Sequence, residues 1–146
     1  MATLKISDLS VGDWVKYNDE DYGWQTSKIA ACGYWGVSIY NTDTDDDELY
    51  DCDTHQIHPI PITAEILEKN GWVFHKGSLW WVCDIDKDTR ANVWLGENGE
   101  CRVEVSTMYG EARTWSNYAD VKLANAHIHL LQRVLRLAGV DKEINL

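Results

Sequence analysis

Both prolines of the chain lie in one short segment, His58-Pro-Ile-Pro-Ile62. A proline has no backbone N–H and fixes its own φ, so two alternating prolines favour an extended connector over a helix or a central strand. A chain of 146 residues is long enough for one domain or for two small modules that share a core. The segment therefore predicts a boundary near residue 60, between a module of residues 1–60 and a module of residues 61–146.

Short apolar runs separated by turn residues precede the prolines. Leu9 to Tyr17 predicts a turn at Gly12 that enters a strand. Three later segments predict further short strands, namely Ser27 to Tyr40, Leu49 to Cys52 and Gln56 to Ile60. Several short strands within about sixty residues are typical of a small barrel. We therefore expect an SH3-like small β-barrel over residues 1–60.

A short helix is predicted directly after the connector. Thr63 is a favourable N-cap, and Gly71 is a favourable residue just beyond a helix end. A strand follows, because Leu79, Trp81, Cys83 and Ile85 alternate and share one face, which is the predicted core face. Adjacent residues of a strand point to opposite faces, so Trp80 is expected on the other side of the sheet. Val73 to His75 is expected to pair with this strand across a tight turn at Lys76-Gly77.

Asn98-Gly99 is the clearest turn in the sequence, because this dipeptide favours a two-residue type I′ hairpin. Counting outward from it pairs Leu95 with Arg102 and Trp94 with Val103. The next segment, Tyr109 to Tyr118, shows no clear period and is expected to be mostly loop.

The last predicted element is an amphipathic helix over residues 120–138. Its apolar residues fill one half of a helical wheel and its polar residues fill the other. His127 falls in the apolar half and is expected to be buried, whereas His129 falls in the polar half. We expect the apolar half to cover one side of the sheet. The predicted class is therefore α+β: an SH3-like small β-barrel, a short helix, an antiparallel β-sheet and a covering C-terminal helix.

The formal charge of −11 is unevenly distributed. Residues 1–60 hold 12 acids and three bases, whereas residues 61–146 hold 12 acids and 10 bases. Nucleic acids and anionic membranes bind clustered Lys and Arg, so neither is an expected partner of the acidic module. Acidity often serves solubility alone. The alternative is that Asp45, Asp46 and Asp47, in the acid-rich loop from Asn41 to Glu48, face a basic protein partner.

Nothing in the sequence predicts a catalytic centre or a bound metal. It contains no nucleophile elbow, phosphate-binding loop, dinucleotide fingerprint or zinc-protease motif. Cys52, His55 and His58 are three apart but have no second Cys/His pair to complete a zinc site. We therefore expect no cofactor. The four cysteines are widely spaced and the N-terminus has no secretory features, which predicts reduced thiols in the cytoplasm. No apolar run approaches a membrane span.

Eight tryptophans are the most unusual feature of the composition. Most are expected to fill the cores of small β modules. Three are candidates for an exposed binding surface: Trp24 and Trp35, which lie near predicted loops, and Trp80, which lies opposite the core face. An aromatic patch of this kind suits a protein partner, a base or a sugar ring.

Three blocks of the sequence resemble an uncharacterised protein family of gut-bacterial genomes and their phages. They are Leu9-Ser-Val-Gly-Asp-Trp-Val, Ile57-His-Pro-Ile-Pro-Ile-Thr-Ala-Glu-Ile-Leu-Glu-Lys-Asn-Gly-Trp72 and His129-Leu-Leu-Gln-Arg-Val-Leu-Arg-Leu-Ala-Gly-Val-Asp-Lys-Glu-Ile144. Residues 84–120 depart from the family, with longer and more acidic loops. The resemblance implies a phage or prophage origin and an intracellular role, and it implies no catalytic residues.

Three functions remain open from the sequence. The first is a non-catalytic phage or prophage accessory protein that binds a protein partner through its acidic module. The second is a module that binds a small ligand, a nucleotide or a sugar, on exposed tryptophans. The third is an enzyme of unrecognised type. The sequence does not predict the oligomeric state.

Overall fold

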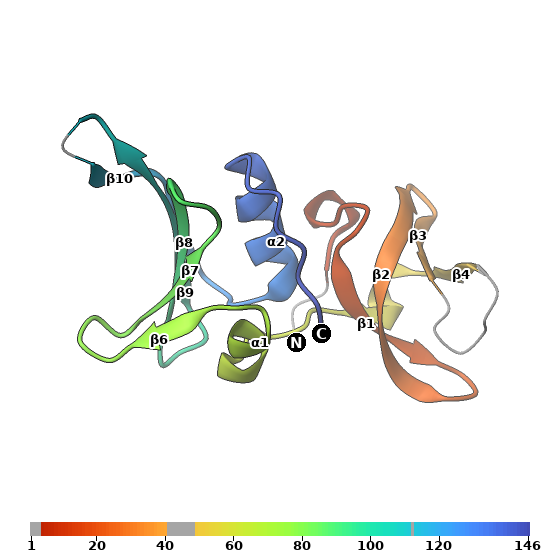
Figure 1. Ribbon diagram of the computed structural model, residues 1–146. Helices are drawn as coiled ribbons and strands as arrows, with labels where there is room; N and C mark the ends of the chain where they lie inside the picture. The colour runs from red at the N-terminus through yellow and green to blue at the C-terminus, as the bar shows by residue number, and fades with distance from the viewer. Residues whose placement is uncertain (1–3, 41–48, 112) are drawn as a thin grey trace. The chain divides into compact units, whose positions relative to one another are not determined.

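The computed structural model describes residues 4–40, 49–111 and 113–146, and its elements are drawn in Figure 1. The chain divides into two compact units, residues 1–60 and residues 61–146. The division falls inside the segment that holds both prolines. Each unit contains a five-stranded antiparallel sheet, and both α-helices of the described residues belong to the second unit. The protein is therefore an α+β protein with more strand than helix.

The first unit is a curled sheet with two 3-10 helices. Its elements are η1 (Ile6–Asp8), β1 (Trp14–Asp19), β2 (Gly23–Gly33), β3 (Gly36–Tyr40), β4 (Leu49–Cys52), η2 (Thr54–Gln56) and β5 (Ile57–His58). The strand order is β4-β3-β2-β1-β5. β4 and β5 lie at the two edges and are not paired with each other in the described residues, so the sheet is a half-barrel. The SH3-like small β-barrel expected for residues 1–60 is therefore not confirmed, because the sheet is open between β4 and β5.

Strand β2 is long because it serves two pairings. Residues 23–28 pair with β1, and residues 29–33 pair with β3. The register shifts between Ile29 and Ala31, which marks a bulge where the strand can bend. The curled sheet encloses one apolar cluster, formed by Leu4, Leu9, Val15, Tyr17, Ile29, Val37, Ile39, Cys52 and Ile57.

Two acids of the first unit have structural partners. The Asp13 carboxylate accepts the backbone N–H of Ser10 at 2.8 Å. The Asp19 carboxylate accepts the backbone N–H groups of Asp21 and Tyr22 at 2.8 and 3.1 Å. Asp13 and Asp19 are 0% and 8% exposed. Part of the acidity of this unit therefore stabilises turns and is not available to a partner.

The second unit is a meander of five strands with two helices. Its elements are α1 (Ala64–Lys69), β6 (Val73–His75), β7 (Trp80–Asp84), β8 (Thr89–Leu95), β9 (Cys101–Tyr109), β10 (Thr114–Leu123) and α2 (Ile128–Leu137). The strand order is β10-β9-β8-β7-β6. The ends of α1 are as predicted: Thr63 accepts the backbone N–H of Ile66 at 3.2 Å, and Gly71 follows the helix with a φ of 90°.

The predicted helix over residues 120–138 is wrong at its start. Residues 120–123 belong to β10, where Asp120, Val121, Lys122 and Leu123 alternate between the two faces of the sheet. The helix begins only at Ile128, with His127 as its N-cap. The segment Tyr109 to Tyr118, expected to be mostly loop, is largely strand, because β9 runs to Tyr109 and β10 starts at Thr114.

The predicted hairpin at Asn98-Gly99 is wrong by one residue. Leu95 pairs with Cys101, Trp94 pairs with Arg102, and Gly96 N–H donates to the Glu100 carbonyl. The loop therefore has three residues, 97–99, and Gly99 alone has a positive φ, of 77°. This is the geometry of a three-residue hairpin loop that ends in a left-handed bulge residue. Glycine favours this loop and the type I′ turn alike, so Gly99 alone does not distinguish them. The shift changes which residues share a face.

The burial of the two histidines also differs from expectation. His129 is 2% exposed, whereas His127 is only partly buried. The helical wheel assigned both histidines to the wrong half, because it included residues 120–127, which precede the helix. Their rings stack with centroids 5.7 Å apart.

Acid is expected to destabilise the fold through His127. Burial lowers its pKa from the usual 6.5, because the imidazolium form loses hydration. The unfolded chain then binds the proton more readily than the folded chain, so the free energy of unfolding falls as pH drops below 6.5. Urea unfolding of the wild type and of H127Q at about pH 7.5 and about pH 5 checks this. The variant is expected to lose less stability between the two pH values, and an equal loss would contradict the prediction.

Candidate binding site

The two faces of the second sheet differ in what covers them. Val121, Val103, Val93 and Trp81 are paired in one row across β10, β9, β8 and β7, so their side chains share one face. Helix α2 lies against this face, because Val121 and Val134 line the same groove. Figure 1 shows α2 on one side of the sheet and no helix on the other. The prediction that Trp80 and Trp81 point to opposite sides of the sheet is therefore confirmed.

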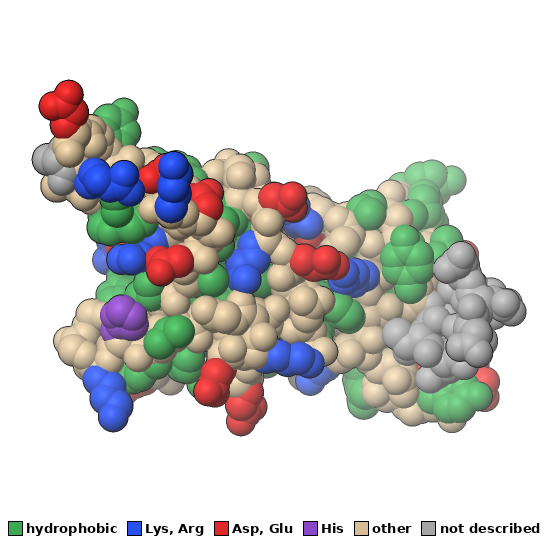
Figure 2. Space-filling view, viewed as in Figure 1, with side chains coloured by type: hydrophobic (Ala, Val, Ile, Leu, Met, Phe, Trp, Pro, Cys, Tyr) green, Lys and Arg blue, Asp and Glu red, His purple; other side chains and the backbone are tan. Residues whose placement is uncertain are grey.

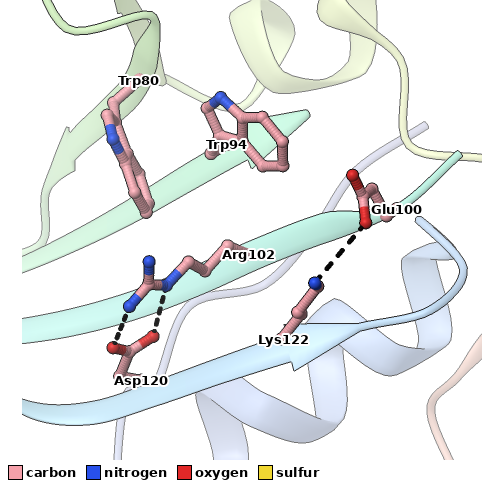
Figure 3. Close-up of a pocket in the computed structure, with 6 residues that line it drawn as sticks. All are labelled: Trp80, Trp94, Glu100, Arg102, Asp120 and Lys122. Atoms are coloured by element: carbon pink, nitrogen blue, oxygen red, sulfur yellow. Dashed lines mark hydrogen bonds and ion pairs between the residues drawn. The ribbon is translucent and has the colours of Figure 1, made fainter. Parts of the chain in front are cut away.

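The helix-free face carries a hollow of about 570 Å³. Its lining comes from four strands and one turn, and consists of Trp80, Trp94, Glu100, Arg102, Asp120 and Lys122. In Figure 3 the two indoles stand on one side of the hollow and the charged side chains lie across from them. Both tryptophans are partly buried, so their rings are held by the sheet but still reach solvent. Volumes of this size are typical of small-molecule sites.

Two ion pairs close the hollow opposite the indoles. Arg102 and Asp120 form a bidentate pair, with Nε to Oδ1 at 2.8 Å and Nη2 to Oδ2 at 2.5 Å. Lys122 Nζ lies 3.8 Å from Glu100 Oε2. The hydrogen bond from Arg102 holds the pKa of Asp120 below its usual 3.8. Asp120 is therefore a carboxylate at neutral pH.

The charges are arranged against the pairing rules of a sheet. Lys122 lies directly opposite Arg102, and Asp120 lies directly opposite Glu104. Like charges in this position repel and destabilise a strand pair. The ion pairs form along the diagonals, and Glu104 adds a carboxylate 3.7 Å from Arg102. An arrangement that violates a local rule is expected where a surface serves binding more than stability.

A further acceptor lies on the same face. Asn92 is the neighbour of Glu104 in the register and lies two residues from Trp94. Its side-chain oxygen is buried and accepts no hydrogen bond in the described structure. A buried acceptor without a donor is costly, but this oxygen has no exposed surface and Asn92 does not line the hollow, so it is not available to a ligand there.

Gly96 sets the position of the Trp94 ring. A Cβ at this position would lie 3.0 Å from two carbons of that ring and 2.6 Å from Glu100 Cγ. The indole therefore packs directly on the backbone of residue 96. An alanine at this position would displace the Glu100 side chain and shift the Trp94 ring by a few tenths of an ångström, without removing either indole of the hollow.

Leu79, directly before Trp80, has a left-handed backbone with a φ of 65°. It lies in the turn between β6 and β7, outside the strand. The prediction that Leu79 shares the core face with Trp81 is therefore wrong. Its side chain is 58% exposed and gains little from burial. Strained backbone of this kind is concentrated at functional sites.

Replacing Leu79 with glycine is expected to stabilise the second unit by about 0.5–1 kcal/mol. The gain is the left-handed strain of about 1–2 kcal/mol, less the extra backbone entropy that glycine loses on folding. Urea unfolding measures the change. L79A is the matched control, because alanine keeps the Cβ that causes the strain. A variant L79G that is less stable than L79A would contradict the prediction.

The other candidate tryptophans belong to the first unit and do not line this hollow. Trp24 is 55% exposed and its ring contacts His58 edge-on at 4.7 Å. Trp35 is 50% exposed, lies at the turn between β2 and β3, and contacts Tyr34 edge-on. The two are at opposite ends of β2 and do not form one platform. Asp45, Asp46 and Asp47 lie outside the described residues.

The sequence missed most of the residues that line the hollow. Trp94 and Arg102 were assigned to different faces by the one-residue register error, and Asp120 and Lys122 were assigned to a helix. Only the alternation of Asp120, Val121, Lys122 and Leu123 could have indicated their place, because it also fits a strand. Glu100 has no sequence pattern that marks it.

The thiols and histidines form no comparable site. All four cysteines are free, and three of them are buried. Burial raises the pKa of Cys52 and of Cys101 to about 11, so neither is a thiolate at neutral pH. Among residues 4–40, 49–111 and 113–146, no group of three His, Cys, Asp or Glu side chains is placed to hold a metal ion. None of the described helices has the length and apolar character needed to cross a membrane.

Charges of both signs alternate over the visible surface of the second unit, and Figure 2 shows no large patch of one sign there. This agrees with its 12 acids and 10 bases. Comparisons of the chain with family models, with curated proteins and with solved structures found no match.

Proposed function

We propose that the protein is a non-catalytic binding protein whose ligand occupies the hollow between Trp80, Trp94 and the Arg102–Asp120 pair. One observation carries the proposal: two partly buried indoles face a bidentate ion pair across an open hollow on the helix-free side of a sheet. Aromatic rings with a few fixed polar groups are the usual composition of small-molecule sites. The ligand class is a ring-bearing small molecule, a nucleotide or a sugar.

The electrostatics of the hollow support binding over acid–base chemistry. A general acid or base works best with a pKa near the operating pH. The pKa of Asp120 is instead lowered, because Arg102 donates two hydrogen bonds to its charged form. A carboxylate held in this way accepts hydrogen bonds and keeps its charge, which suits recognition.

Tryptophan fluorescence tests the site. Ligands from a panel of nucleotides and neutral oligosaccharides are expected to change the emission of the wild type with saturation. W80A and W94A are expected to weaken the affinity at least about tenfold, the effect of losing one stacking contact. G96A is expected to weaken it too, because it displaces Glu100 and shifts Trp94. W115A is the matched control, since Trp115 is already covered by the Arg90 guanidinium at 4.3 Å and lies outside the hollow. Equal affinity in W80A, W94A and the wild type would refute the site.

A second candidate function is protein binding through the first unit. We infer that this unit is an SH3-like barrel left open at one side, and the strand order with η2 directly before β5 supports that inference. Its described residues expose five aromatic side chains: Tyr22, Trp24, Tyr34, Trp35 and Tyr40. Exposed aromatics on an acidic module suit a basic partner, because cations bind both carboxylates and ring faces.

This second function fits a phage or prophage accessory protein of the cytoplasm, and the four free thiols suit a reducing compartment. Capture of a basic host protein is expected to weaken as salt is raised, because exposed charges are screened. The double variant W24A/W35A is expected to reduce capture, and W80A is the control that leaves it unchanged. Capture that is equal at low and high salt would count against this function.

A further inference from the structure

The charges and hydrogen-bonding groups of the hollow restrict the chemistry of its ligand. We propose that the ligand is an uncharged saccharide, whose ring lies against Trp80 and Trp94 and whose hydroxyl groups bond Asp120 and Arg102. The proposal rests on the proposed function, because it names the ligand of the same site. It selects one of the two ligand classes that the indoles alone leave open.

The cations of the hollow are already engaged. Arg102 donates to both oxygens of Asp120 and has a second carboxylate, Glu104, 3.7 Å away. Lys122 lies beside Glu100. These five side chains carry three negative and two positive charges. A phosphate needs cations that are free to pair with it, and here it would meet a net negative surface. A nucleotide is therefore disfavoured.

Hydroxyl groups match the bonding capacity that remains. A carboxylate oxygen has two lone-pair sites, so Asp120 can accept further hydrogen bonds while it holds Arg102. A guanidinium has five N–H donors, and Arg102 uses two of them on Asp120. A hydroxyl both donates and accepts, so neighbouring hydroxyls on one ring can bond the acid and the base together.

The indoles match the faces of a sugar ring. The C–H bonds on the face of a pyranose form an apolar, weakly positive surface, and the face of an indole is negative. Trp80 and Trp94 come from neighbouring strands, β7 and β8, and both line the hollow. Its volume of about 570 Å³ lies within the range of small-molecule pockets.

Isothermal titration of the full chain distinguishes the ligand classes. The probes are short neutral oligosaccharides of glucose, mannose, xylose and N-acetylglucosamine, and the nucleotides ATP, GTP, CTP and UTP, each to about 10 mM. At least one neutral oligosaccharide is expected to bind the wild type, with an affinity that changes little between low and high salt, because no net charge is neutralised. W80A and W94A are expected to lose at least about tenfold in affinity, and W115A is expected to match the wild type.

The variant D120N gives opposite results for the two ligand classes. It keeps the shape of the side chain but removes its negative charge, so Arg102 is held less firmly, with Glu104 still 3.7 Å away. Saccharide binding is expected to weaken at least about tenfold, because a charged acceptor of hydroxyl groups is lost. Phosphate binding would instead strengthen, because one repelling carboxylate is lost and Arg102 is held less firmly. Circular dichroism and thermal unfolding establish that each variant is folded.

Each outcome bears on one proposal or on both. Saccharide binding that needs Trp80 and weakens in D120N supports both. A nucleotide that binds through Trp80 and gains affinity in D120N overturns the saccharide assignment and leaves the proposed binding function standing. No binding of any probe overturns both, and so does binding that W80A and W94A leave unchanged.

Discussion

Replacing Trp72 with alanine is expected to lower the free energy of unfolding of the second unit by about 3–5 kcal/mol, the range for removing a buried large aromatic side chain. Trp72 is 1% exposed and is among the largest fully buried side chains. It lies three residues beyond the end of α1, and its backbone N–H donates to the Leu67 carbonyl at 3.0 Å. The truncation would leave a cavity at the point where α1 enters the sheet.

The surroundings of the Trp72 ring raise the cost of its removal. The Lys142 ammonium lies 5.0 Å from the ring centroid, so the ring also anchors the C-terminal segment. The indole N–H has no hydrogen-bond acceptor in the described structure. W72F therefore loses ring volume but no satisfied hydrogen bond, and it is expected to cost clearly less than W72A.

Urea unfolding followed by circular dichroism measures the loss in both variants. W24A is the matched control, because Trp24 is 55% exposed and its removal leaves no cavity. A loss below about 1 kcal/mol in W72A would contradict the packing described for this residue, since that is the range of surface substitutions.

Local patterns predicted the ends of α1 and the two faces of β7. Thr63 and Gly71 act through hydrogen bonds and dihedral angles within a few residues, so the sequence alone determines them. Trp80 and Trp81 are adjacent in a strand, and their opposite directions follow from the pleat of any strand. These features require no knowledge of distant partners.

The missed features depend on pairing between distant residues. Asp120 to Leu123 fits a helical wheel and a strand equally well over four residues, and its place in β10 follows from pairing with β9. The hairpin at Gly99 could close with a two-residue or a three-residue loop, and the register follows from burying Val93 and Val103 on the same face. The hollow combines both errors, because it needs Trp94 beside Arg102 and Asp120 in a strand. The sequence therefore predicted one residue of the site, Trp80. It did not predict that Trp94, Arg102 and Asp120 lie beside it.

Replacing Asn70 with alanine is expected to lower the free energy of unfolding of the second unit by about 2–4 kcal/mol, because several buried polar groups lose their partners. Asn70 is 7% exposed and ends α1. Its side-chain N–H groups donate to the carbonyls of Ile66 at 2.8 Å and Asn145 at 2.7 Å. Its side-chain oxygen accepts the backbone N–H of Asn145 at 2.7 Å. The amide thus pairs with the backbone of residue 145 as a neighbouring strand would.

The loss is expected to extend beyond Asn70 itself. Ile144 is 1% exposed, and the pairing at Asn145 holds it in place from the C-terminal side. Without that pairing the end of the chain gains freedom, and part of the burial of Ile144 is lost. Faster hydrogen exchange at the backbone N–H of Asn145 in N70A is the direct measure of this release.

N145A is the matched control, because Asn70 bonds backbone atoms of residue 145 and not its side chain. Asn70 binds only the backbone of residue 145, so N145A keeps all three hydrogen bonds and is expected to change stability by less than about 0.5 kcal/mol. N70D is expected to be at least as harmful as N70A, because it removes both donors and buries a charge. A cost in N145A equal to that in N70A would show that the side chain of residue 145, and not its backbone, holds the C-terminal segment to α1.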